Sequence, residues 1–167
     1  MRIISILLAT FVLIIACNKE NTNRNTKDCF KTINTYSFRE NAKVDTGRNI
    51  QFFYATINAG SKLVFKYNSD TFPICPEIQD GSSSYSLVFE TDPSITSFTY
   101  VTGDLQNAKV YSRLSCGECS DVSKNASVPV SGTINGTKLS ATSWQINFDV
   151  ETNLHDHLTG SAIFTRE

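Results

Sequence analysis

The chain has 167 residues, a formal net charge of −1, 40% hydrophobic residues and 19% charged residues. This length is typical of one domain, and the 15 basic and 16 acidic side chains show none of the basic excess of nucleic-acid-binding proteins. Aromatic residues make up 11% of the chain, which excludes a collagen-like or intrinsically disordered protein. With only 2 His in the whole sequence, candidates for acid–base catalysis are few.

The N-terminus has the pattern of a targeting segment. Arg2 precedes a run over residues 3–16 that is apolar apart from Ser5 and Thr10. The run is shorter than the about 20 residues that a membrane-spanning helix needs. A basic start followed by a short apolar run is typical of a secretory signal peptide.

The end of this run, Ile14-Ile15-Ala16-Cys17, resembles the lipobox of bacterial lipoproteins. In that family a small residue precedes the Cys, which receives a diacylglycerol on sulfur before cleavage on its amino side; the new amino group is then usually acylated. The resemblance implies a signal peptide over residues 1–16 and a lipid, including palmitate, on Cys17. Two or three acyl chains would anchor the protein stably to a membrane. The alternatives are an ordinary signal peptide with a coincidental Cys and an uncleaved anchor.

A polar segment follows the expected lipid site. Residues 18–28 read NKENTNRNTKD and contain no apolar side chain. Such a segment buries too little surface to offset its ordering entropy, so residues 17–28 are expected to form a flexible, lipid-anchored tether. We therefore expect a single domain over residues 29–167, held at the cell envelope on the periplasmic or outer face of the outer membrane.

The remainder of the chain is predicted to be all-β, because short apolar segments alternate with turn signals. The clearest strand spans residues 143–151, where apolar residues alternate with polar ones and so define one buried face. These apolar residues are Trp144, Ile146, Phe148 and Val150. Asn135-Gly136 is expected to be a hairpin turn after a strand at 128–134, because this dipeptide favours the positive φ angles of tight turns.

The other expected strands follow the same pattern. They span residues 50–57, 62–68, 85–90, 95–101, 108–114 and 158–166, with 33–39 as an additional edge strand. Their spacing favours an antiparallel β-sandwich of about seven to nine strands. A closed, lipocalin-like β-barrel around a small ligand is the alternative, although Trp144 does not stand near the first strand as the tryptophan of that family does.

With Cys17 assigned to lipid, Cys29, Cys75, Cys116 and Cys119 remain, and an even set in an oxidising compartment predicts disulfide bonds. Cys116 and Cys119 form a C-x-x-C, but a redox motif would require the start of a helix in a βαβ unit. A zinc site would require ligands in pairs, whereas Cys29 and Cys75 are isolated. We favour structural disulfides, with Cys75 joined to Cys116 or Cys119.

His155 and His157 flank Asp156 in an expected loop. On an extended strand, residues i and i+2 point the same way, so both imidazoles could bind one metal ion. Two ligands are too few for a tight site, and a solvated loop is the alternative.

No catalytic residues are assigned, since both histidines share one loop and no Gly-x-Ser-x-Gly elbow is present. Carboxylates near expected turns could pair for glycoside cleavage, with solvation as the alternative explanation. These residues are Glu77, Asp80, Glu90, Asp92, Asp104, Glu118 and Asp121. The sequence therefore favours a lipid-anchored binding or structural module, with an envelope protein or a glycan as partner and no cofactor. The alternatives are an envelope hydrolase using loop carboxylates and a barrel that carries a small ligand.

Overall fold

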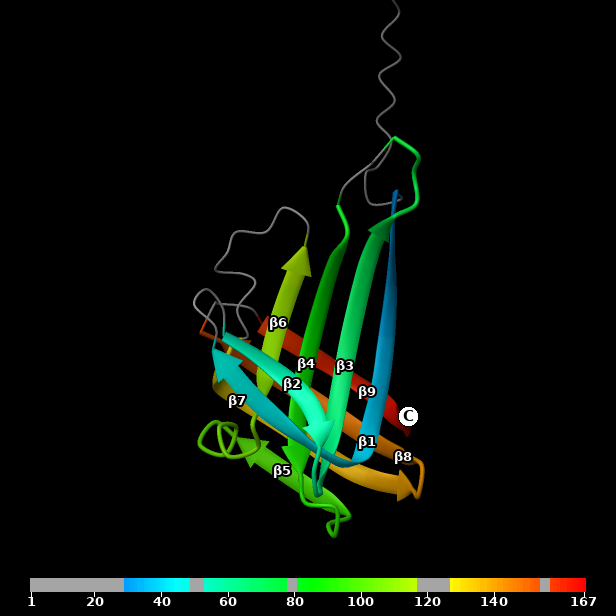
Figure 1. Ribbon diagram of the computed structural model, residues 1–167. Helices are drawn as coiled ribbons and strands as arrows, with labels where there is room; N and C mark the ends of the chain where they lie inside the picture. Colours follow the sequence, from blue (N-terminus) through cyan, green and yellow to red (C-terminus); the bar gives the residue numbers. More distant parts are fainter. Residues whose placement is uncertain (1–28, 49–52, 78–80, 117–126, 154–156) are drawn as a thin grey trace, which may run out of the picture.

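The computed structural model describes residues 29–48, 53–77, 81–116, 127–153 and 157–167. Nine strands run through these residues and form one mixed sheet (Figure 1). They are β1 (Phe30–Arg48), β2 (Phe53–Ala59), β3 (Lys62–Pro73), β4 (Ser83–Thr91), β5 (Ser97–Val101), β6 (Tyr111–Cys116), β7 (Pro129–Ser140), β8 (Ser143–Thr152) and β9 (His157–Arg166). The described residues contain no α-helix, so the prediction of an all-β chain is confirmed.

The sheet curls into a half-barrel with the strand order β5-β7-β8-β9-β1-β3-β4-β6, and β2 pairs separately with β1. β1 and β9 are parallel and join through only two residue pairs, Ser37 with Thr165 and Phe38 with Arg166. This short junction divides the sheet into two arms. In Figure 1, β3, β4 and β6 cross in front of β7, β8 and β9, and the core lies between them.

Aromatic rings from both arms fill this core. The ring of Phe65 on β3 lies 5.4 Å from Trp144 on β8, 5.0 Å from Phe89 on β4 and 5.9 Å from Phe164 on β9. The predicted inner face of β8 is confirmed, because its four alternating apolar side chains are all buried: Trp144, Ile146, Phe148 and Val150. The alternation of strand residues thus places one continuous apolar layer between the arms.

One predicted turn is not found. Asn135-Gly136 does not form a turn but lies within β7, and the chain reverses only after Ser140. Gly136 is opposite Phe98 of β5, and a Cβ atom at this position would overlap the Phe98 ring. The glycine therefore allows close packing rather than a tight turn.

The strand expected at residues 33–39 is part of the longer strand β1, which pairs with β9 only at Ser37 and Phe38. Within the described sheet, residues 33–36 therefore pair on one side only, with β3. β1 pairs with β3 from Phe30 to Arg39, and the register then shifts between Arg39 and Ala42. At this bulge Asn41 has a φ of 53°. Beyond it, β1 turns away from β3 and pairs with β2. The other expected strands each overlap an observed strand, although residues 50–52 of the strand predicted at 50–57 lie outside the described residues.

Cys75 forms a disulfide with Cys29, at a Cα–Cα distance of 5.0 Å, and not with Cys116 or Cys119 as we favoured. The reason is topological, since β1 begins beside the end of β3, and the amide of Ile74 donates a hydrogen bond to the carbonyl of Cys29 at 2.8 Å. Cys116 ends β6, and Cys119 lies outside the described residues.

Three further predictions also fall outside the described part of the chain: the signal peptide over residues 1–16, the lipid site at Cys17 and the tether over 17–28. Across the described ranges, no helix has the length and apolar character needed to cross a bilayer.

Candidate functional site

The hairpin formed by the end of β1 and by β2 folds over the outer face of the sheet, the face of β3, β4 and β6 that points away from the aromatic core. In Figure 1, β2 crosses in front of β3 and β4. A second, smaller apolar cluster fills the space beneath it, with Ala42, Val44 and Val64 buried and partly buried side chains packed around them. The partly buried residues are Ala55, Ile57, Val88 and Tyr111.

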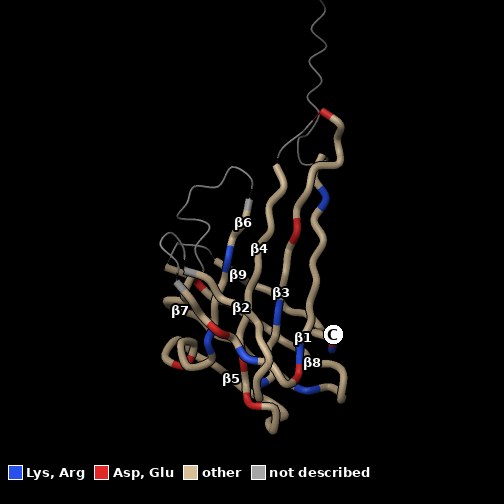
Figure 2. The backbone as a smooth tube through the Cα atoms, viewed as in Figure 1, with Lys and Arg blue, Asp and Glu red and all other residues tan. Residues whose placement is uncertain are grey.

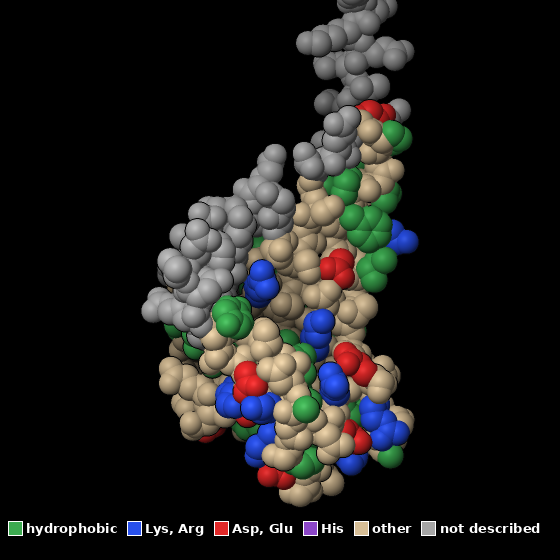
Figure 3. All heavy atoms as spheres, viewed as in Figure 1, with side chains coloured by type: hydrophobic (Ala, Val, Ile, Leu, Met, Phe, Trp, Pro, Cys, Tyr) green, Lys and Arg blue, Asp and Glu red, His purple; other side chains and the backbone are tan. Residues whose placement is uncertain are grey.

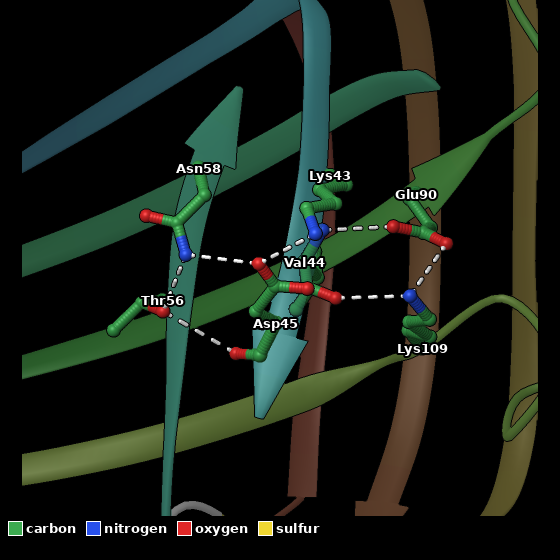
Figure 4. A network of polar contacts seen from close by, with 7 residues as sticks. All are labelled: Lys43, Val44, Asp45, Thr56, Asn58, Glu90 and Lys109. Carbon is green, nitrogen blue, oxygen red and sulfur yellow. Dashed lines mark hydrogen bonds and ion pairs between the residues drawn. The ribbon is translucent and has the colours of Figure 1, made fainter. Parts of the chain in front are cut away.

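Two side chains hold this hairpin in place: Glu90 on β4 and Lys109 in the turn before β6 (Figure 4). The backbone N–H of Val44 donates to Oε2 of Glu90 at 2.8 Å, and Nζ of Lys109 donates to the carbonyl of Val44 at 3.0 Å. Lys109 also lies 3.2 Å from Oε1 of Glu90, whose side chain is 8% exposed. Because β1 has left β3 at this point, Glu90 and Lys109 satisfy backbone groups that the sheet no longer pairs.

A second set of polar contacts ties β1 to β2. The amide of Asn58 donates to Oδ2 of Asp45 at 3.0 Å, and Lys43 forms an ion pair with the same oxygen at 3.0 Å. The hydrogen bond from Asn58, followed by that from Lys43, holds the pKa of Asp45 below its ordinary value. Thr56 adds a bond of 3.4 Å to the carbonyl of Asp45. The hairpin is therefore fixed both internally and against the sheet.

A groove of about 340 Å³ lies between β2 and the outer face of the sheet. We call it the β2 groove. Its lining residues are Ala55, Thr56 and Ile57 on β2, Lys66 and Asn68 on β3, Ser86 and Val88 on β4, and Tyr111, Ser112 and Arg113 on β6.

The strand register arranges the floor of the β2 groove in two rows. One row is formed by Lys66, Val88 and Tyr111, which are cross-strand neighbours on β3, β4 and β6. The other row, two residues further along each strand, is formed by Asn68, Ser86 and Arg113. Residues two apart on a strand point to the same face, so all six side chains belong to the outer face.

Lys66 and Arg113 are the charged residues that line the β2 groove. Neither has an ion-pair or hydrogen-bond partner within the described ranges. The nearest carboxylate along β3 is Asp70, which accepts a hydrogen bond from the Asn68 amide at 2.6 Å. Figure 2 shows the Lys and Arg positions on β3 and β6 in blue, and Figure 3 shows the basic side chains on this face. Two cations thus face a partly apolar groove without a carboxylate between them.

A second hollow, of about 400 Å³, brings together three of the acidic residues singled out in the sequence: Glu90, Asp92 and Asp104. Each carboxylate has a local partner. Asp92 accepts hydrogen bonds from the hydroxyl of Ser94 at 2.6 Å and from its backbone N–H at 2.9 Å, which hold the pKa of Asp92 below its ordinary value. Asp104 accepts from the N–H of Val101 at 3.2 Å. These contacts hold turns together, and a lowered pKa does not suit a general acid.

Tyr100 also lines this hollow. Its hydroxyl donates to Oγ1 of Thr91 at 2.6 Å, and burial raises the pKa of Tyr100. Of the other acidic candidates, Glu77 lies in the turn after β3, away from this group. Asp80, Glu118 and Asp121 lie outside the described residues.

The structure places His157 at the start of β9, where its Nε2 lies 2.6 Å from Oδ1 of Asp149 on β8. Both side chains are well exposed and line a hollow of about 450 Å³ with Glu151. No group of three or more His, Cys, Asp or Glu side chains suited to a metal ion occurs within the described ranges. His155 and Asp156 lie outside them, so the two-histidine metal site stays a prediction.

Lys66 and Arg113 are the residues that sequence reasoning missed. Alternation along their strands would have placed both on the solvent face, but only the fold of the β1–β2 hairpin turns that face into a groove. Comparison of the chain with family models, with curated proteins and with solved structures finds no match.

Proposed function

We propose that this chain is a lipid-anchored protein of the cell envelope whose β domain is a binding module, with the β2 groove as its ligand site. The observation that carries the binding role is the pair of cations, Lys66 and Arg113, lining one groove without partners among the described residues. A Lys or Arg side chain without a carboxylate partner can donate its hydrogen bonds to an anionic ligand.

The Cys29–Cys75 disulfide supports the envelope location, because structural disulfides persist in oxidising compartments and are rare in the cytosol. The resemblance of Ile14-Ile15-Ala16-Cys17 to a lipobox supports a lipid on Cys17. The chain enters the domain at Cys29, directly beside this disulfide. A tether from Cys17 would therefore join a cross-linked end of the half-barrel.

This arrangement would leave the β2 groove accessible above the membrane. Pro73 pairs with Phe30 at the start of β1, and Lys66 lies further along β3 from that end. At ~3.3 Å per residue, the distance from Pro73 to Lys66 is roughly 23 Å. The groove would face the envelope space rather than the lipid.

For the architecture, we propose that the two arms pack against each other like the layers of a sandwich, rather than forming a lipocalin-like barrel. Support comes from the filled interior, in which Phe65 of one arm contacts Trp144 of the other at 5.4 Å. A carrier barrel would need room for a ligand at this position. The alternative of a hydrolase has less support, because Glu90 and Asp92 accept hydrogen bonds from the protein itself.

The lipid anchor is tested by growing an expressing bacterium with labelled palmitate and fractionating its membranes. We expect the wild-type chain to carry label and to sediment with membranes. Cys17→Ser should remove the label, and the variant chain should be either unprocessed or released from the membrane. The matched variant Cys116→Ser should remain labelled. Retention of label in Cys17→Ser would contradict the proposal.

A further inference from the structure

We infer that the β2 groove binds a small organic anion, with its acidic group between Lys66 and Arg113 and its apolar body against β2 and Val88. This inference rests on the binding role proposed above and names the class of ligand. A ligand of this class combines one carboxylate, phosphate or sulfonate with a compact hydrophobic part.

The charge of the ligand follows from the two unpaired cations. Lys66 and Arg113 stand on strands separated by β4 and in adjacent rows of the floor. In a regular sheet this places their Cα atoms roughly 12 Å apart, with both side chains on one face. The guanidinium of an Arg binds carboxylate and phosphate oxygens through two parallel hydrogen bonds, and a Lys adds a mobile point charge. One acidic group can therefore contact both residues.

The hydrophobic part follows from the remaining lining residues. Ala55 and Ile57 on β2 face Val88 and Tyr111 on the sheet, and all four pack on the small apolar cluster. Ser86 contributes a neutral hydrogen-bonding group beside Arg113. A free inorganic ion would leave this apolar surface uncovered, whereas an aromatic or branched body would bury it.

The size of the groove limits the ligand to a small molecule. Its volume of about 340 Å³ lies near the lower end of the ~300–1,000 Å³ of ligand pockets. We therefore expect a single head group and a body of one or two rings.

The test uses the full mature chain in a non-ionic detergent, titrated in a calorimeter with 2-naphthoate, with its neutral amide 2-naphthamide and with inorganic phosphate. Detergent alone provides the blank. We expect 2-naphthoate to bind at least about tenfold more tightly than the other two compounds. Lys66→Gln and Arg113→Gln should each lower the affinity for 2-naphthoate about tenfold and leave the affinity for 2-naphthamide unchanged.

Two further variants make the test specific. Lys138→Gln removes an exposed cation on β7, away from the groove, and should leave the affinity for 2-naphthoate unchanged. Arg113→Lys keeps the positive charge but loses the planar guanidinium group. Its affinity for 2-naphthoate should therefore lie between those of wild type and Arg113→Gln. Melting curves of all variants show whether each is folded; Arg113 is exposed, so little change is expected.

Equal affinities for 2-naphthoate and 2-naphthamide, or no effect of Lys66→Gln and Arg113→Gln, would overturn the inference. The lipid anchor is measured separately, by palmitate labelling. Loss of anchoring with retained 2-naphthoate binding would contradict the envelope assignment alone. Normal anchoring without 2-naphthoate binding would contradict the ligand class alone.

Discussion

The buried carboxylate of Glu90 accepts a hydrogen bond of 2.8 Å from the backbone N–H of Val44, across 46 positions of the sequence. This bond takes the place of a strand-to-strand contact, because the pairing of β1 with β3 ends at Ala42, opposite Lys62 at the start of β3. It fixes the β1–β2 hairpin against β4, and that hairpin forms one wall of the β2 groove. The shape of the proposed ligand site thus depends on a carboxylate that is not among its lining residues.

Replacing this carboxylate should destabilise the protein. Glu90→Ala leaves the N–H of Val44 without its acceptor and the ammonium of Lys109 without its ion-pair partner, and we expect a loss of about 2–3 kcal/mol in the free energy of unfolding. Glu90→Gln keeps one acceptor and should cost less. Urea denaturation measures both, with the exposed Glu151→Ala as control at under about 0.5 kcal/mol. Equal costs for Glu90→Ala and Glu151→Ala would contradict the role of Glu90.

Asp45 predicts a pH dependence of stability. Its pKa is lowered in the folded state by the hydrogen bonds from Asn58 and Lys43. The carboxylate therefore stabilises the fold above its ordinary pKa of 3.8, and this contribution is lost as the pH falls through the lower, folded-state value. Wild type should exceed Asp45→Asn in stability at about pH 6, and the two should converge near about pH 2. Denaturation at both pH values measures the difference; a gap that does not change with pH would contradict this assignment.

The disulfide gives a third prediction. Peptide mapping under non-reducing conditions should recover Cys29 joined to Cys75. Because the bridge spans 46 positions, its loss in a Cys29→Ala, Cys75→Ala double variant should cost about 4 kcal/mol in the chain-entropy model. Thermal or urea unfolding measures this cost. Recovery of Cys75 bonded to Cys116 or Cys119 would instead support the pairing that sequence reasoning favoured.

Trp144 should be among the most sensitive core positions. It is fully buried between the arms, and Trp144→Ala should cost about 3–5 kcal/mol. Trp144→Phe should cost less, since the indole N–H has no hydrogen-bond partner in the described part of the chain. Gln145→Ala, on the opposite face of β8, should cost under about 1 kcal/mol, the worth of its bond to Ser161. Similar losses at Trp144 and Gln145 would refute the assignment of the two faces.

Sequence reasoning succeeded where alternation is regular. In β8, the period of two over Trp144 to Val150 determines which face is buried, and the structure agrees because local pattern and global packing favour the same arrangement. The prediction failed at Asn135-Gly136, because a glycine can serve either a tight turn or close packing, and here it allows close packing against Phe98. The local sequence does not distinguish these two uses.

The candidate site was largely beyond prediction for a related reason. Lys66 and Arg113 are separated by 46 intervening residues along the chain. They line one groove because their strands, β3 and β6, both pair with β4. The wall of that groove depends on a bulge between Arg39 and Ala42, in a polar segment without an apolar pattern. Cysteine pairing was equally non-local, since it depends on β1 beginning where β3 ends.

The most direct test of the account is a crystal structure of the mature chain saturated with 2-naphthoate. The predicted result is one molecule in the β2 groove, with its carboxylate about 2.8 Å from the Arg113 guanidinium and within reach of the Lys66 ammonium. Its rings should lie against Ile57 and Val88. A groove that stays free of the compound at saturation, or a compound bound only elsewhere on the chain, would contradict the assignment of this groove as the ligand site.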